Sequence, residues 1–121
     1  MILVRCKEMT DGEPAGYIPQ LARADVTKWG VSICSIDGQR YSIGDSRDMF
    51  SIQSTSKPFT YGLCLEHLGQ EVQEYIGREP SGRVFNSLNL DHNNQPHNPM
   101  INSGAIMSAA LLLDKGNEQL T

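Results

Sequence analysis

Two short segments with alternating apolar and polar side chains lie in the first half of the chain, at residues 29–36 and 39–43. In the first of them, Val31 and Ile33 are two positions apart and would share one face of a strand. The pair Asp37-Gly38 separates the two segments. An Asp-Gly pair between alternating segments is the strongest short-range signal for a β-hairpin. The pattern therefore predicts an antiparallel hairpin.

Helical periodicity follows from about Ser54 to His67, and Gly69 is suited to cap the end of that helix. Pro58 fits only the first turn, because a proline further along would break the hydrogen-bond ladder. The spacing thus places Ser54 at or beside the helix N-terminus. Shorter helical segments are predicted at residues 18–23 and 70–76, and an irregular segment rich in Gly, Pro and Asn is predicted at residues 77–99.

A last helix is predicted over residues 103–115, with Asn102 as its N-cap. Its apolar face is expected to carry Ile106, Ala109, Ala110 and Leu113. The helix is apolar around most of its circumference, so it needs cover on more than one side. One hairpin and one preceding helix provide little cover, and a sheet usually needs three strands for independent stability. We therefore expect part of the fold to lie outside these residues.

The composition narrows the possible classes of protein. The chain has 121 residues, 39% of them apolar, and a formal net charge of −4. This length suits one compact domain. A nucleic-acid-binding protein would show a basic excess, and a membrane span would need an apolar run of roughly 20 residues, so neither partner is expected.

The three cysteines are widely spaced and odd in number. Neither a disulfide framework nor a metal-binding CxxC pair fits them, which favours a reducing, intracellular compartment. Cys34 and Cys64 are expected to be small buried side chains. His67, His92 and His97 match no zinc template, so no metal or other cofactor is predicted.

The candidate chemistry lies in the Ser-x-x-Lys motif formed by Ser54 and Lys57. On a helix, residues three positions apart share a face, so this hydroxyl and amine could meet. Serine is a weak nucleophile until a base takes its proton, and a neutral lysine amine can be that base. The backbone N–H of Ser54 could also contribute to an oxyanion hole. The alternative is an N-capping serine followed by a solvated lysine.

The segment 50–59 around this motif resembles the active-site segment of the serine-dependent glutaminases, relatives of β-lactamases and penicillin-binding proteins. The resemblance extends from about residue 16 to residue 113 and is strongest to the animal enzymes. Further segments that match in order and at matching spacing are residues 16–22, 29–32, 37–40, 44–45, 77–82, 85–86 and 96–106.

The resemblance implies an α+β fold, as part of the three-layer α/β/α sandwich of β-lactamase-like proteins. Residues 1–15 would be a lead-in, and residues 16–121 would be the N-terminal part of a catalytic domain. Other pocket groups of the family, among them a glutamate, an asparagine, several tyrosines and a Lys-Ser-Gly-like strand, would lie beyond Thr121. We therefore expect negligible turnover from this segment alone.

The resemblance also implies the roles of five side chains. Ser54 would be the nucleophile that forms a γ-glutamyl ester with glutamine, and Lys57 would be its base. Gln53, Tyr17 and Asn102 resemble residues that contact the substrate. Each of these three has an alternative: a loop amide for Gln53, packing for Tyr17 and an N-cap for Asn102.

By the same resemblance, the protein would be a homo-oligomer, and a mitochondrial one, although no targeting segment is visible in the sequence. Two other functions stay open. One is a non-catalytic fragment that acts through binding or assembly, and the other, more remote, is an acyl-serine protein that recognises β-lactams.

Overall fold

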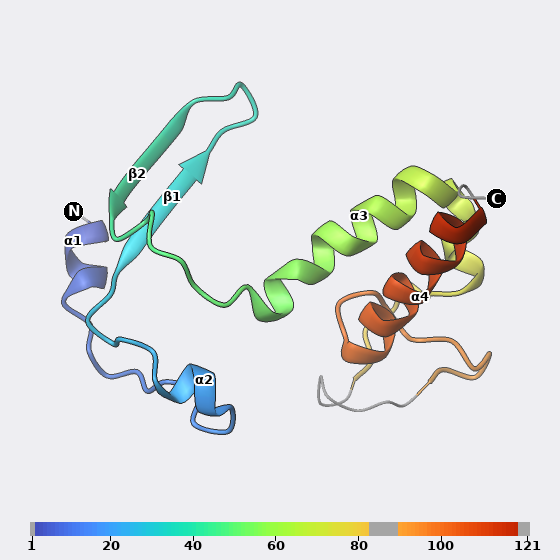
Figure 1. Cartoon of the computed structure of the whole chain (residues 1–121), viewed down its shortest axis with the longest axis horizontal. Coiled ribbons are helices and arrows are strands. Elements are labelled where there is room, and N and C mark those ends of the chain that lie inside the picture. Colours follow the sequence, from blue (N-terminus) through green and yellow to red (C-terminus); the bar gives the residue numbers. More distant parts are fainter. Residues whose placement is uncertain (1, 83–89, 119–121) are drawn as a thin grey trace. The chain divides into compact units, whose positions relative to one another are not determined.

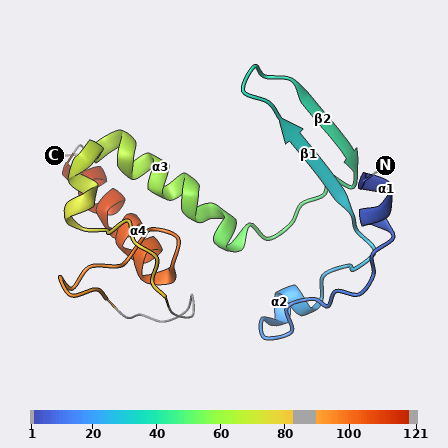
Figure 2. The same cartoon turned by 180° about the vertical axis from the view of Figure 1, so that it is seen from behind.

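The computed structural model describes residues 2–82 and 90–118. The chain divides into two compact units, Met1–Ser51 and Ile52–Thr121, and each is described by itself. Figures 1 and 2 show the elements of both units from opposite sides. Residues 85–86, one of the segments on which the resemblance rests, lie outside the described residues.

The first unit contains the predicted hairpin. Its two strands pair antiparallel, with Val31 opposite Ile43 and Ile33 opposite Tyr41. The short helix near residue 19 is also confirmed, while the helix at the start of the chain was not predicted. The elements of this unit are α1 (Ile2–Lys7), α2 (Pro19–Ala22), β1 (Gly30–Cys34) and β2 (Arg40–Gly44).

The turn of the hairpin forms because its residues satisfy one another locally. The Ser35 N–H donates to the Gln39 carbonyl at 3.0 Å, and the Gly38 N–H donates to the Ser35 carbonyl at 3.0 Å. Gly38 has a φ of +85°, a conformation that glycine adopts without steric cost. The Asp37 carboxylate accepts from the Ser35 hydroxyl and, at 2.7 Å, from Gln39 Nε2. These bonds hold the pKa of Asp37 below its ordinary value.

The expectation that Cys34 is buried is wrong. Its side chain is exposed, and Ile33 in the same strand is exposed as well. The physical reason is that no described element of the first unit packs over the two-stranded sheet. A hairpin alone has no second layer against which an apolar face can be buried.

The second unit is helical, and the helix predicted from Ser54 to His67 is present in two parts. A 3-10 turn, η1 (Gln53–Ser56), runs directly into α3 (Lys57–Leu68), and Pro58 lies in the first turn of α3. Gly69 ends α3 with a φ of +57°. The next predicted helix is a 3-10 segment, η2 (Gly69–Glu74), and the last is α4 (Asn102–Glu118).

Helices α3 and α4 pack against each other and enclose the core of this unit (Figure 1). The thiol of Cys64 in α3 is buried there and donates to the Ser108 carbonyl of α4 at 3.1 Å. Burial raises the pKa of the Cys64 thiol. The core cluster comprises Cys64, Val72, Ile76 and Leu111, with Tyr61, Leu68, Met107 and Leu112 packed around it.

Helix α4 buries a different face from the one predicted. Ile106 is 62% exposed and Leu113 72% exposed, and Ala109 and Ala110 are exposed too. Within residues 102–114 of α4, the buried ones are Ser103, Gly104, Ser108 and Leu111. The small side chains let the neighbouring backbone approach closely, and the Ser108 hydroxyl is satisfied by the Gly104 carbonyl at 2.9 Å. Packing shape, rather than hydrophobicity alone, selects this face.

The segment between η2 and α4 is irregular in the residues described, as predicted, apart from an isolated bridge between Leu90 and Pro96. Within residues 2–82 and 90–118, no helix has the length and apolarity that crossing a bilayer would need.

Candidate active site

Ser54 lies in η1, one turn before α3 begins. Its carbonyl accepts the backbone N–H of Lys57, so the 3-10 turn leads continuously into the helix. The Ser54 side chain is exposed. The sequence placed this hydroxyl at or beside the helix N-terminus, and the structure confirms that placement.

Gln53, the residue before Ser54, has a φ of +44°. Such a backbone conformation costs a residue with a side chain about 1–2 kcal/mol. Strained backbone of this kind persists only where the surroundings fix it, and it is frequent at functional sites. The Gln53 carbonyl accepts a hydrogen bond from the Ser56 hydroxyl at 2.8 Å, and this bond joins the first and last residues of η1.

Lys57 is joined to Asn102 by a hydrogen bond between the first residues of α3 and α4. Lys57 Nζ donates to Asn102 Oδ1 at 2.8 Å, in partly buried surroundings and across 45 residues of sequence. Asn102 is the first residue of α4 rather than its N-cap, so the predicted boundary is wrong by one residue. Its side-chain oxygen accepts from Lys57, a role that capping alone does not explain.

The start of α4 is held in place by Asn98. Asn98 Oδ1 accepts the Met100 N–H at 3.0 Å, and Asn98 Nδ2 donates to the Glu79 carbonyl at 2.9 Å. Gly104 lies against the Asn98 backbone so closely that an added Cβ would meet the carbonyl oxygen at 2.0 Å. Asn98 and Gly104 thus fix where Asn102 stands. Neither role was predicted from the sequence, although both residues lie in segment 96–106.

The hydrogen-bond partner of the Lys57 amine is uncharged. This partner is an amide, and neither α3 nor α4 has an acidic residue in its first turn. The ion pair found among the described residues joins Lys28 to Asp48, and both of these residues belong to the first unit. The site therefore combines an exposed hydroxyl, an amine and an amide near two helix N-termini, where partial positive charge favours developing negative charge.

The structure brings some of the predicted residues together. Lys57 and Asn102 are in contact, and Gln53 and Ser54 are adjacent in η1. Between the described residues, no hydrogen bond links Ser54 Oγ to Lys57 Nζ. Tyr17 belongs to the first unit and is 78% exposed.

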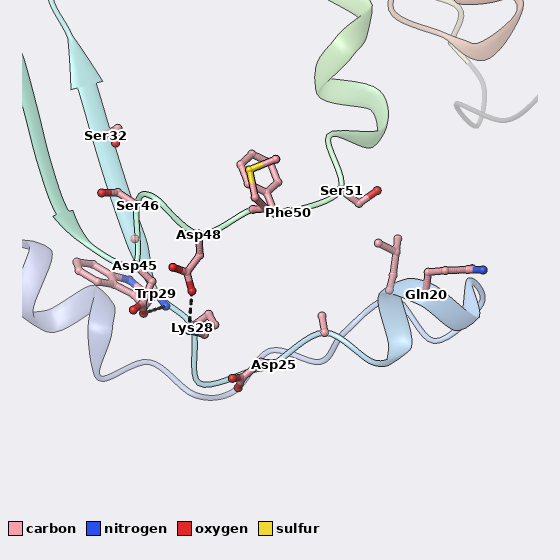
Figure 3. Close-up of a pocket in the computed structure, with 14 residues that line it drawn as sticks. Gln20, Asp25, Lys28, Trp29, Ser32, Asp45, Ser46, Asp48, Phe50 and Ser51 are labelled. Carbon is pink, nitrogen blue, oxygen red and sulfur yellow. Dashed lines mark hydrogen bonds and ion pairs between the residues drawn. The ribbon is translucent and has the colours of Figure 1, made fainter.

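A pocket of about 770 Å³ lies in the first unit, between α2 and the base of the hairpin (Figure 3). None of the five predicted site residues lines it. Two of its charged groups form an ion pair, Lys28 with Asp48 at 2.5 Å, and the Asp45 carboxylate accepts the backbone N–H of Trp29 at 2.9 Å. The Asp48 carboxylate raises the pKa of Lys28. Lys28, Asp45 and Asp48 therefore have partners within the unit itself.

The described parts of the chain contain no set of side chains arranged as metal ligands. There, no group of three or more His, Cys, Asp or Glu side chains is placed so that it could hold a metal ion.

Comparison with known proteins identifies the family. The model of the family described as Glutaminase matches residues 12–121. Putative glutaminase 2 of Caenorhabditis elegans is 51% identical over 113 residues, which cover 93% of this chain and 19% of the relative. The mitochondrial liver isoform of glutaminase from Rattus norvegicus is 46% identical over 107 residues, which cover 88% of this chain and 18% of the relative.

Solved structures agree with this. The crystal structure of Mglu in its tris and glutamate form matches with a TM-score of 0.81 and 39% identity, over 92% of this chain and 25% of that one. The probable glutaminase ybaS matches with a TM-score of 0.76 and 38% identity, over 87% of this chain and 35% of that one. The α+β, β-lactamase-like fold predicted from the sequence is confirmed, and this chain spans about a fifth of the length of the worm and rat relatives. The chain belongs to the glutaminase family.

Proposed function

We propose that this chain carries the nucleophile and the base of a glutaminase, which hydrolyses L-glutamine to L-glutamate and ammonia through an acyl-enzyme on Ser54. Family membership supports the reaction. The observation that carries the proposal is the 2.8 Å bond from Lys57 Nζ to Asn102 Oδ1, since it holds the amine of the Ser-x-x-Lys motif near the start of α3.

In the first step, Ser54 Oγ attacks the γ-carbonyl carbon of glutamine while its proton passes to the Lys57 amine, which acts as the base. The oxyanion that forms would be stabilised by the backbone N–H of Ser54 in η1. The C–N bond then breaks, and Lys57 returns the proton to the departing nitrogen, which leaves as ammonia. Water attacks the γ-glutamyl ester in the second step, which releases glutamate and restores the serine hydroxyl.

Three side chains would orient the substrate. Asn102 offers both an amide donor and an amide acceptor, which suits the α-amino and α-carboxyl groups of glutamine. Gln53 would contact the substrate beside the nucleophile, and its fixed backbone suits that position. By the family resemblance, Tyr17 would also contact the substrate.

Ammonia release by the full 121-residue chain tests the proposal. The expected result is a burst of ammonia that does not exceed one equivalent per chain and is followed by negligible turnover. Ser54→Ala should abolish the burst. Ser42→Ala is the matched control, because Ser42 is an exposed serine of β2 that lies outside η1, and it should retain the burst. A chain without any burst would favour the alternative of a non-catalytic segment that acts through binding or assembly.

The cellular setting is part of the proposal. Rat and mouse relatives are named as mitochondrial enzymes, which supports a mitochondrial protein. Family resemblance supports a homo-oligomer. Cell fractionation and light scattering of the purified protein test these two statements separately.

A further inference from the structure

We propose that Asn102 is a positioning residue for Lys57, in addition to any contact that it makes with the substrate. This inference rests on the proposed function, because it assigns Asn102 a part in the work of the Lys57 base. The amide oxygen of Asn102 holds the amine at the start of α3 before substrate arrives.

The geometry supports a fixed amine. A lysine side chain has four rotatable bonds, and an unrestrained amine would sample many positions. Here the bond from Nζ to Asn102 Oδ1 is 2.8 Å long and partly buried, and it selects one of those positions. The acceptor itself is on a firm support, since Asn98 and Gly104 fix the first turn of α4.

The chemistry of the acceptor suits a base that gains and loses a proton. An amide oxygen accepts an N–H from a neutral amine and from an ammonium ion alike. The bond can therefore persist while the proton arrives from Ser54 and leaves with ammonia. A carboxylate at the same position would favour the charged amine throughout, because it attracts the ammonium.

Two variants of Asn102 with side chains of similar size test the hydrogen bond and the lack of charge of its acceptor separately. Asn102→Leu removes the acceptor, whereas Asn102→Asp keeps an acceptor and adds a negative charge. Asn93→Leu is the matched control, because Asn93 is exposed and its side chain makes no hydrogen bond with the described residues. Circular dichroism first establishes that each variant keeps its helices.

The first measurement is the rate at which an acylating reagent modifies each lysine of the 121-residue chain, read by mass spectrometry. Exposed Lys7 is the internal reference. Loss of one hydrogen bond predicts that Lys57 is modified about threefold faster in Asn102→Leu. Asn102→Asp should slow the modification of Lys57, and Asn93→Leu should leave it unchanged. Equal Lys57 rates in the wild-type chain and both Asn102 variants would overturn the proposal.

The second measurement is the acylation of Ser54 by a p-nitrophenyl ester that has no amino or carboxyl group. Such a probe makes none of the contacts of the amino-acid end of glutamine, so a residue that only binds substrate would not affect it. We expect Asn102→Leu to slow the acylation about tenfold or more. Unchanged acylation, with Lys57 modified faster, would overturn the positioning role. If the wild-type chain reacts no faster than Ser54→Ala, the proposed function fails, while the Lys57 rates still decide whether Asn102 holds the amine.

Discussion

The carbonyl oxygen of Asn98 lies against the α-carbon of Gly104, where a Cβ on Gly104 would be only 2.0 Å from that oxygen. Backbone atoms cannot move aside as the end of a flexible side chain can. The first turn of α4 therefore requires glycine at this position. The same turn carries Asn102, so the contact links the packing of the helix to the geometry of the site.

We expect Gly104→Ala to destabilise the chain by about 1–3 kcal/mol, as overpacking does. The matched control is Gly62→Ala in α3, where nothing lies within 4 Å of the new Cβ. That change should stabilise the chain by about 0.5–1 kcal/mol, because alanine favours a helix. Urea unfolding followed by circular dichroism measures both. Similar effects of the two substitutions would contradict the close contact at Gly104.

The exposed and buried faces of α4 are tested by two leucines. Leu111 is 9% exposed and belongs to the core, whereas Leu113 is 72% exposed. Leu111→Ala should cost about 2–5 kcal/mol of the free energy of unfolding, from lost burial and the cavity left behind. Leu113→Ala should change it by about 0.5 kcal/mol at most. If Leu113→Ala lowered the free energy of unfolding more than Leu111→Ala, α4 would bury the face that was predicted from hydrophobicity.

The cysteines should differ in their reaction with a thiol reagent such as Ellman's reagent. Cys6 and Cys34 are exposed and should react quickly in the native chain. Cys64 is buried, its thiol donates to the Ser108 carbonyl, and burial raises its pKa, so little reactive thiolate forms. Urea should bring Cys64 to the rate of the other two. Fast reaction of Cys64 without denaturant would contradict the packing of α3 against α4.

The turn at residues 91–96 should weaken in acid. Asp91 Oδ1 accepts the backbone N–H of Gln95 at 2.9 Å and that of Asn93 at 2.8 Å. These two bonds hold the pKa of Asp91 below its ordinary value of 3.8, and the bond from the Gln95 N–H contributes most. A lowered pKa in the folded state means that the stabilisation is present above the unfolded value and is lost as the pH falls through the folded one.

A titration of the Asp91 carboxyl carbon by NMR measures this directly. The midpoint should lie below 3.8 in the native chain and return to 3.8 in urea. Asp91→Ala should remove the pH dependence of the amide signals of Asn93 and Gln95. A native midpoint at or above the ordinary value would show that the carboxylate does not accept these bonds.

The sequence predicted those elements whose signals are local. The Asp37-Gly38 pair was sufficient to place the hairpin turn, because the turn residues satisfy one another. Pro58 fixed the start of α3, since proline is tolerated only in the first turn. For the same reason the position of Ser54 near the helix N-terminus was predicted correctly.

Features that depend on contacts distant in sequence were not predicted. The bond between Lys57 and Asn102 spans 45 residues, and no local pattern reveals it. The prediction of the buried face of α4 was wrong, because the small residues Gly104 and Ser108 are buried although they carry little apolar surface. The prediction that Cys34 is buried was wrong, because the alternation of a strand does not show whether a second layer covers the strand.

The central claim is that Ser54 is the residue acylated by glutamine. The most direct test mixes the 121-residue chain with L-glutamine, quenches with acid, and locates any added mass by peptide mapping. We expect one γ-glutamyl group per chain, attached to Ser54, retained in Ser42→Ala and lost in both Ser54→Ala and Lys57→Ala. A γ-glutamyl group on any other residue, or none at all in the wild-type chain, would contradict it.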